Sequence, residues 1–148
     1  MTNPADANHD AYAEGLRLWR EWTEMWNGRT ELALTLAAPK FALHLTLPTI
    51  DPATINTPEA VERWVRGHRA KYQRLVFLNG VGPFVDVTAG VVAGPWHAET
   101  TVDGTPRIVC GMDTLRFSGG KITEYWTLSK PVDELGTWST GLAGTSAR

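Results

Sequence analysis

The sequence predicts an α+β fold, because helical spacing of apolar residues fills most of its first half and strand-like alternation fills its second half. Three helices are expected before about residue 75, with one strand between the second and the third. Two turn signals, Asp103-Gly104 and Ser118-Gly119-Gly120, indicate β-hairpins in the second half. At 148 residues the chain has the length of one domain, and it shows no internal repeat.

The first helix is expected to begin at Asp10, as a helix cap, and to end at Trp26, before Asn27-Gly28. Residues 1–8 are small and polar, and they are expected to be flexible. One stripe of this helix carries apolar residues at helical spacing and should face the core. Its members are Tyr12, Leu16, Trp19, Thr23 and Trp26, flanked by Gly15 and Trp22.

A short second helix, ELALTLAA, is expected after the capping residue Thr30 and before Pro39. The alternation from Lys40 to Leu47 predicts the first strand, which places His44 on the opposite side from the leucines. Thr57 and Pro58 are typical of a helix start, and the third helix is expected to reach about Leu75.

The strand-rich half is divided by glycines and by Pro83. Strands are expected at Val76–Leu78, Phe84–Thr88 and Val91–Val102, followed by a hairpin of Arg107–Phe117 and Lys121–Leu128. The folded core should therefore cover about residues 10–130 of a single domain. The small, polar end of the chain, 139–148, is expected to be a mobile tail.

Composition and motifs argue against several classes of function. The net charge is −2 without a basic stripe, so a nucleic-acid partner is not expected, and no apolar run has the length of a membrane span. The single cysteine, Cys110, allows no intrachain disulfide, and a cytoplasmic location is expected. The chain has no CxxC, no HExxH and no glycine-rich phosphate loop, so neither a metal nor a cofactor is expected. Seven tryptophans would fit either a core or a large apolar pocket.

Asp113 is the one carboxylate on an otherwise apolar strand face. Because side chains alternate along a strand, it shares that face with Val109, Gly111, Leu115 and Phe117. A carboxyl group in such a place finds a partner or has its pKa raised by burial, which acid–base enzymes exploit. A strand-end aspartate bonded to a backbone amide is an equally good interpretation of the pattern alone.

The hairpin also carries a family resemblance. The stretch G-x-D-T-L-R-F-S-G-G-K-I-x-E-Y-W, from Gly111 to Trp126, resembles the last hairpin of the NTF2-like fold in its SnoaL-like and ketosteroid-isomerase-like branches. The expected order of elements over residues 10–130 is similar to that fold as well. The resemblance implies a curved antiparallel sheet that wraps around three helices to form a cone with an apolar pocket.

The resemblance assigns catalysis to Asp113, at the position where ketosteroid isomerases have a protonated aspartate that donates a hydrogen bond to the reacting oxygen. His44 stands where that family has its proton-shuttling aspartate, and Trp22 stands where it has a tyrosine. These two departures argue against a ketosteroid isomerase. Thr127 replaces the last aspartate of limonene-epoxide-hydrolase-like members, which argues against epoxide hydrolysis. A SnoaL-like cyclase, which uses one aspartate, is compatible with Asp113.

Strand parity predicts which residues line the pocket beside Asp113. The expected substrate-binding residues are Trp22, Trp96, Leu115, Phe117, Tyr125 and Thr127, with His68 and Tyr72 on the buried stripe of the third helix. For His68 a core position is favoured over a catalytic role, whereas for His44 the two are level.

The predicted function is therefore cofactor-independent acid–base chemistry, a cyclisation or an isomerisation of a small hydrophobic, polyketide-like molecule, with Asp113 and His44 as the catalytic pair. A pericyclic closure in a shaped pocket is a third possibility. The alternative is a non-catalytic ligand-binding or interaction module, because this fold hosts both. Met112 and Trp126 would place apolar area on the convex face of the sheet, which predicts a homodimer.

Overall fold

The computed structural model describes residues 4–45 and 49–131, and it has the predicted α+β architecture. The helices are α1 (Pro4–Trp26), α2 (Ala33–Leu36) and α3 (Pro58–Arg69), with single 3₁₀ turns at Thr30–Leu32 and Pro52–Thr54. The strands are β1 (Ala37–His44), β2 (Arg74–Asn79), β3 (Phe84–Asp86), β4 (Val91–Val102), β5 (Thr105–Ser118) and β6 (Lys121–Pro131). The last predicted residues of the first strand, 46–47, and the predicted tail, 139–148, lie outside the described residues.

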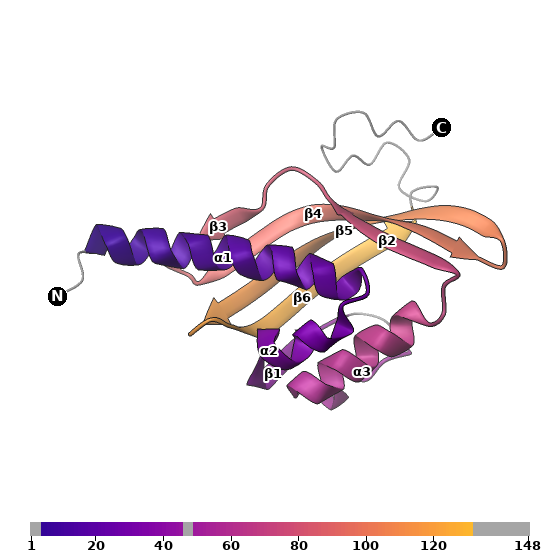
Figure 1. The fold of residues 1–148 in the computed structure, drawn as a ribbon, viewed down its shortest axis with the longest axis horizontal. Coiled ribbons are helices and arrows are strands. Elements are labelled where there is room, and N and C mark those ends of the chain that lie inside the picture. Colours follow the sequence, from indigo (N-terminus) through magenta and orange to yellow (C-terminus); the bar gives the residue numbers. More distant parts are fainter. Residues whose placement is uncertain (1–3, 46–48, 132–148) are drawn as a thin grey trace.

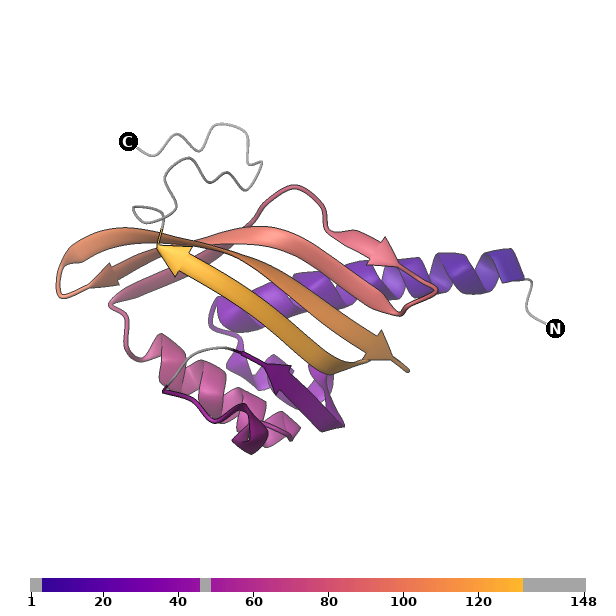
Figure 2. The same cartoon turned by 180° about the vertical axis from the view of Figure 1, so that it is seen from behind.

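One curved sheet organises the molecule, in the order β1-β6-β5-β4-β2, with β3 also paired to β4. The long strands β4, β5 and β6 are antiparallel, but β1 runs parallel to β6, so the sheet is mixed rather than purely antiparallel as expected. The helices lie on one face of this sheet: α1 passes in front of β4–β6 in Figure 1, and the view from behind in Figure 2 shows these strands with α1 beyond them. No described helix covers the other, outer face.

Both predicted hairpin turns are confirmed. Asp103 and Gly104 have φ values of 49° and 72°, and Gly119 and Gly120 have 56° and 73°. Two successive residues with positive φ are typical of turns whose twist matches that of the flanking strands. The second turn pairs Phe117 with Ile122, and a bulge next to this pair shifts the register of β5 and β6 by one residue. Asp113 therefore lies directly opposite Thr127.

Helix α1 begins earlier than expected and turns a slightly different stripe inward. It starts at Pro4 instead of Asp10, so residues 4–8, which were expected to precede the helix, belong to it. Proline suits the first turn of a helix, and Asp6 in that turn is favoured by the helix dipole. The most deeply buried residues of α1 are Leu18, Trp22 and Met25, whereas Tyr12, from the predicted stripe, is exposed.

The segment between α1 and α3 also differs from the prediction in its boundaries. Strand β1 begins at Ala37 and includes Pro39, which leaves only four residues for α2. Because β1 is an edge strand, a proline without an N–H is tolerated there. The cap of α3 is confirmed, since the Thr57 hydroxyl accepts a hydrogen bond from the Ala60 amide. The helix ends at Arg69 and not near Leu75 as expected, and Leu75 belongs to β2.

Polar side chains attach β2 to the end of α1. The Asn27 amide nitrogen donates to the Phe77 carbonyl at 2.9 Å, and the Phe77 N–H donates to the Asn27 side-chain oxygen at 2.7 Å. The Arg69 guanidinium donates to the carbonyls of Trp26 and Leu75. These bonds hold the edge of the sheet beside the C-terminal half of α1, where the candidate site lies.

Candidate functional site

Asp113 lies in the middle of β5 and points to the helix-covered face, as strand parity predicted. Its side chain is buried, with 6% exposure, and both of its oxygens accept hydrogen bonds. The Trp96 indole N–H, from β4, donates to Oδ1 at 2.7 Å. The Tyr125 hydroxyl, from β6, donates to Oδ2 at 3.0 Å. Three adjacent strands therefore fix the position of this one carboxyl group.

Burial raises the pKa of Asp113 from 3.8 to about 6, because the charged form loses its hydration. Hydrogen bonding from Thr127, Trp96 and Tyr125 opposes this shift by favouring the ionised form, and the Trp22 indole acts in the same direction. The pKa of Tyr125 is raised well above its usual value, first by burial and then by the nearby Asp113. Tyr125 thus remains a protonated donor, and Asp113 can hold or release a proton near neutral pH.

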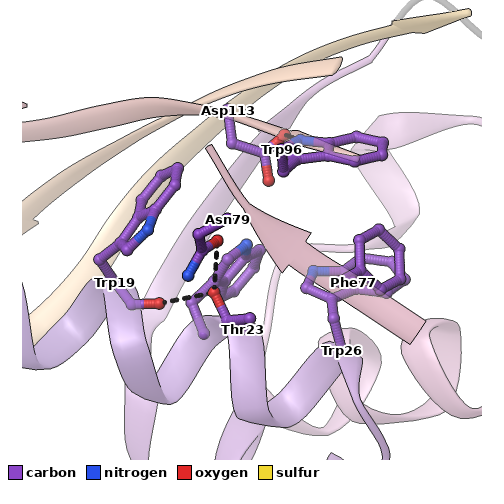
Figure 3. A pocket seen from close by; sticks show the side chains of 8 residues that line it. Trp19, Thr23, Trp26, Phe77, Asn79, Trp96 and Asp113 are labelled. Atoms are coloured by element: carbon purple, nitrogen blue, oxygen red, sulfur yellow. Dashed lines mark hydrogen bonds between the residues drawn. The ribbon is translucent and has the colours of Figure 1, made fainter. Parts of the chain in front are cut away.

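A narrow pocket adjoins Asp113 between α1 and strands β2, β4 and β5, and Figure 3 shows the side chains that line it. It is lined by Trp19, Trp22, Thr23, Trp26, Phe77, Asn79, Trp96 and Asp113. The free volume is about 10 Å³, which corresponds to the space of about one water molecule. In this conformation the indole rings fill most of the expected pocket.

Three of the pocket tryptophans carry unpaired donors. The indole nitrogens of Trp19, Trp22 and Trp26 are buried and have no partner within hydrogen-bond distance in the described part of the chain, although that of Trp22 still favours the ionised form of Asp113. In Figure 3 the nitrogens of Trp19 and Trp26 lie on the sides of their rings that face the space between them. Because an indole N–H can only donate, the group that would complement it is an acceptor, such as a carbonyl oxygen.

The pocket has a second polar side formed by Thr23 and Asn79. The Thr23 hydroxyl lies 3.1 Å from the Trp19 carbonyl and 3.2 Å from the Asn79 side-chain oxygen (Figure 3). A hydroxyl has only one hydrogen, so both contacts are satisfied at once when the amide is turned and Asn79 donates to Thr23. The pocket thus offers polar groups from α1 and β2 in addition to the carboxyl group on β5.

The structure brings several of the predicted site residues together. Trp22 and Trp96 line the pocket, and Tyr125 and Thr127 reach Asp113 from β6. Leu115 and Phe117 face the same side of the sheet, but they are buried in the core and do not line the pocket. The predicted residues farther along β5 therefore support the fold rather than the site.

His68 and Tyr72 lie one layer behind the pocket. The His68 ring packs edge-on against Trp26, at 5.6 Å between ring centres, and lies 5.3 Å from Tyr72. Burial, together with the nearby Lys71 and Arg69 charges, lowers the pKa of His68. Neither residue lines this pocket, which favours the core interpretation of His68, and their predicted role in substrate binding stays a prediction.

The prediction that His44 shares a cavity with Asp113 is wrong. His44 points to the outer face of the sheet, where its Nε2 lies 3.0 Å from a Glu124 carboxylate oxygen. Its ring stacks on Trp126 at 4.5 Å and 9°. The reason is the alternation of β1: the apolar Phe41 and Leu43 take the buried side, which leaves His44 on the other.

We expect His44→Ala to leave the pKa of Asp113 unchanged, because the two side chains lie on opposite faces of the sheet. Loss of the partly exposed contact with Glu124 should reduce the free energy of unfolding by less than about 1 kcal/mol. The measurements are an NMR titration of the Asp113 carboxyl carbon and urea unfolding of both proteins. A changed pKa of Asp113 in His44→Ala would show that His44 does act on the site.

Five of the residues that line the pocket were not predicted as site residues, although three of them were predicted to face the core. Trp19, Thr23 and Trp26 were predicted on the inward stripe of α1 without a role in the site. Phe77 and Asn79 were not singled out, because their role depends on the pairing of β2 with β4, in which Asn79 lies opposite Trp96. The period-two alternation of β2 places both on one face, but only the register reveals which strand lies beside them.

Metal ligation has no support in the described residues, which contain no group of three or more His, Cys, Asp or Glu side chains placed to hold an ion. The described helices include none with the length and apolarity needed to cross a membrane.

Comparison with solved structures identifies the fold. A predicted polyketide cyclase from Acidithiobacillus ferrooxidans matches with a TM-score of 0.67 and 19% identity, over 79% of this chain and 88% of that one. A SnoaL-like polyketide cyclase from Agrobacterium tumefaciens matches with a TM-score of 0.63 and 13% identity, over 80% and 95%. A protein with a ketosteroid isomerase-like fold from Catenulispora acidiphila, in complex with trimethylamine, matches with a TM-score of 0.59 and 19% identity, over 75% and 83%.

No protein-family model and no curated protein matches the sequence. The similarity to solved structures thus confirms the resemblance drawn from the last hairpin at the level of the fold. The chain has the NTF2-like fold of SnoaL-like and ketosteroid isomerase-like proteins.

Proposed function

We propose that this chain, with the fold of SnoaL-like polyketide cyclases, is a cofactor-independent acid–base enzyme. Its reaction is the cyclisation or isomerisation of a small, hydrophobic, polyketide-like molecule, with Asp113 as the group that takes up and returns a proton. The observation that carries this proposal is the buried Asp113 carboxyl group, held between Trp96 and Tyr125, with a pKa of about 6. A group that titrates close to neutral pH is suited to both directions of proton transfer.

The unpaired indole donors support a substrate that carries carbonyl oxygens. An unsatisfied buried donor costs about 1–3 kcal/mol, and the pocket has two such donors, on Trp19 and Trp26, that do not already act on Asp113. A carbonyl oxygen that entered the pocket would recover part of this cost. The same donors would stabilise the negative charge that develops on that oxygen when a neighbouring carbon loses its proton.

Both proposed reactions begin with the same step. The ionised Asp113 removes a proton from the carbon beside a carbonyl group, and the electron pair of the broken C–H bond becomes the enolate. In a cyclisation the enolate carbon then attacks a second carbonyl of the same molecule, and the resulting alkoxide takes the proton from Asp113. In an isomerisation the proton returns to a different carbon. Either way, Asp113 ends the cycle ionised.

A specific observation favours the alternative function, a non-catalytic binding or interaction module. The free space beside Asp113 has room for about one water molecule, so a larger ligand enters only when indole side chains move. A chain whose tryptophans served solely as core would show the same filled pocket. The two functions differ in what happens after a ligand binds.

Deuterium exchange with α-tetralone, an apolar ketone, separates the two functions. An acid–base enzyme should catalyse exchange of the hydrogens beside the carbonyl in D₂O, as followed by proton NMR, and an Asp113→Asn variant should lack this activity. Binding of the ketone, seen as a change in tryptophan fluorescence, without catalysed exchange would favour the module. If the protein neither binds the ketone nor catalyses its exchange, the result counts against both functions for this class of ligand.

We also propose that two copies of the chain pair through the outer face of the sheet. Met112 and Leu128 lie directly opposite each other on β5 and β6, and they are exposed by 40% and 67%. An exposed apolar pair of this kind is stabilised when a second surface covers it. The prediction is a dimer in sedimentation equilibrium at micromolar concentration, which Leu128→Glu should dissociate. A parent protein that sediments as a monomer would contradict it.

A further inference from the structure

Trp96 and Gly111 lie directly opposite each other on β4 and β5. A Cβ atom placed on Gly111 would lie 2.7 Å from Trp96 Cε2, closer still to Cζ2, and 2.7 Å from the Leu128 carbonyl oxygen. Real Cβ atoms essentially never approach other heavy atoms so closely. The indole of Trp96 therefore lies across the Cα of Gly111, in space that any other residue would fill.

This placement directs the indole N–H at Asp113. Asp113 is two residues beyond Gly111 on the same face of β5, and the Trp96 nitrogen lies 2.7 Å from its Oδ1. On the other side the indole packs against Phe77, with 5.1 Å between ring centres and a 62° angle between the rings. Trp96 is buried, with 8% exposure, so the ring is confined between Gly111 and Phe77.

We propose that Gly111 is a positioning residue for Asp113: because it lacks a side chain, it lets Trp96 lie flat against β5, from where the indole N–H holds the carboxyl group. The inference rests on the proposed function for its significance, since Asp113 is the candidate catalytic group. Gly94 offers a comparison on β4, directly opposite Asp113. A Cβ there would lie 3.1 Å from Trp19, and its three nearest atoms belong to Trp19 and Pro83 rather than to Trp96.

The test is Gly111→Ala, with Gly94→Ala as the matched control. The Trp96 indole N–H resonance, assigned by its absence in Trp96→Phe, reports the hydrogen bond, and the Asp113 carboxyl carbon reports its pKa. We expect Gly111→Ala to move the indole resonance upfield and to raise the pKa of Asp113 above about 6, because a donor to the ionised form is lost. Gly94→Ala should leave the indole resonance in place. An unchanged indole resonance and carboxyl titration in Gly111→Ala would overturn the proposal.

Two further variants keep the test decisive. Adding Gly111→Ala to Trp96→Phe should shift the Asp113 titration no further than Trp96→Phe alone, because the donor is already gone; an additional shift contradicts the proposal. Should Gly111→Ala fail to fold, the double variant with Trp96→Ala decides. Recovery of folding supports the proposal, since the vacated indole space accepts the new Cβ. Continued failure, where Trp96→Ala alone folds, refutes it, since the conflict then lies with the Leu128 carbonyl.

These readouts use the protein without substrate. Failure of the tetralone exchange would therefore contradict the proposed enzyme while leaving the role of Gly111 measurable. An unmoved Trp96 in Gly111→Ala would contradict the positioning role without affecting the exchange result.

Discussion

Replacing Asp113 by alanine is expected to lower the rate of catalysed deuterium exchange by about a hundredfold or more. The substitution removes the only carboxyl group among the described residues that line the pocket, and proton transfer by a positioned side chain typically contributes about 100- to 10,000-fold in rate. The measurement is the exchange rate for α-tetralone at saturating ketone, compared with the parent protein. Asp10→Asn, an exposed carboxyl group on α1, is the control and should exchange at the parent rate.

Asp113→Asn separates the two roles that a carboxyl group can have here. Asparagine keeps the shape and can still donate a hydrogen bond, but it cannot transfer a proton. Activity close to that of the parent in the Asn variant, with an inactive Ala variant, would assign Asp113 to hydrogen bonding. Loss of activity in both assigns proton transfer. Normal exchange in both folded variants would show that Asp113 is structural and that the proposed mechanism is wrong.

The pH dependence of the exchange identifies the active form of Asp113. With a pKa of about 6, the carboxyl group is ionised above that pH and neutral below it. A role as base therefore predicts a rate that rises with pH through about 6 and then levels off, whereas a role as neutral donor predicts the reverse.

The inward face of each strand of the site hairpin follows from strand alternation, but the pairing of the two strands does not follow from the turn alone. The glycine turn with positive φ fixes the pairing only as far as Phe117 and Ile122. Asp113, Tyr125 and Thr127 lie on one buried surface, as predicted, because a bulge shifts the register by one residue; without it, Trp126 would lie opposite Asp113. The outer position of His44 was predictable by the same rule, because Phe41 and Leu43 are apolar and must be the buried pair. The resemblance to ketosteroid isomerases instead predicted that His44 faces the pocket, and the structure agrees with the alternation.

Other features depend on contacts between distant segments, which the sequence does not reveal. Pro39 would end a helix in most settings. Here it lies in β1, an edge strand whose only neighbour in the sheet is β6, so its missing N–H is tolerated. The roles of Phe77 and Asn79 follow from the pairing of β2 with β4 and from the bonds of Asn27 to the β2 backbone. The narrowness of the pocket follows from how the tryptophan rings pack against one another, and composition alone left core and pocket open.

Asp113→Asn is also expected to change how stability depends on pH. The unfolded chain has an Asp113 pKa near 3.8 and the folded chain one of about 6, so between these values the folded protein holds a proton that the unfolded chain has released. The free energy of unfolding therefore falls as pH rises through this window. The contribution is fully present below about pH 4 and lost above about pH 6, and it amounts to about 3 kcal/mol for a shift of this size.

Asparagine does not titrate, so the variant should lack this loss. The expected result is that the free energy of unfolding of Asp113→Asn, relative to the parent, increases by about 3 kcal/mol between pH 3 and pH 7. Urea unfolding at several pH values measures this difference, and the comparison between pH values cancels any constant cost of altered hydrogen bonds to Trp96 and Tyr125. Other titrating groups are common to both proteins and cancel as well. Asp10→Asn should follow the parent curve. Parallel curves for Asp113→Asn and the parent would mean that burial does not raise the pKa of Asp113, and the chemical basis of the candidate site would be lost.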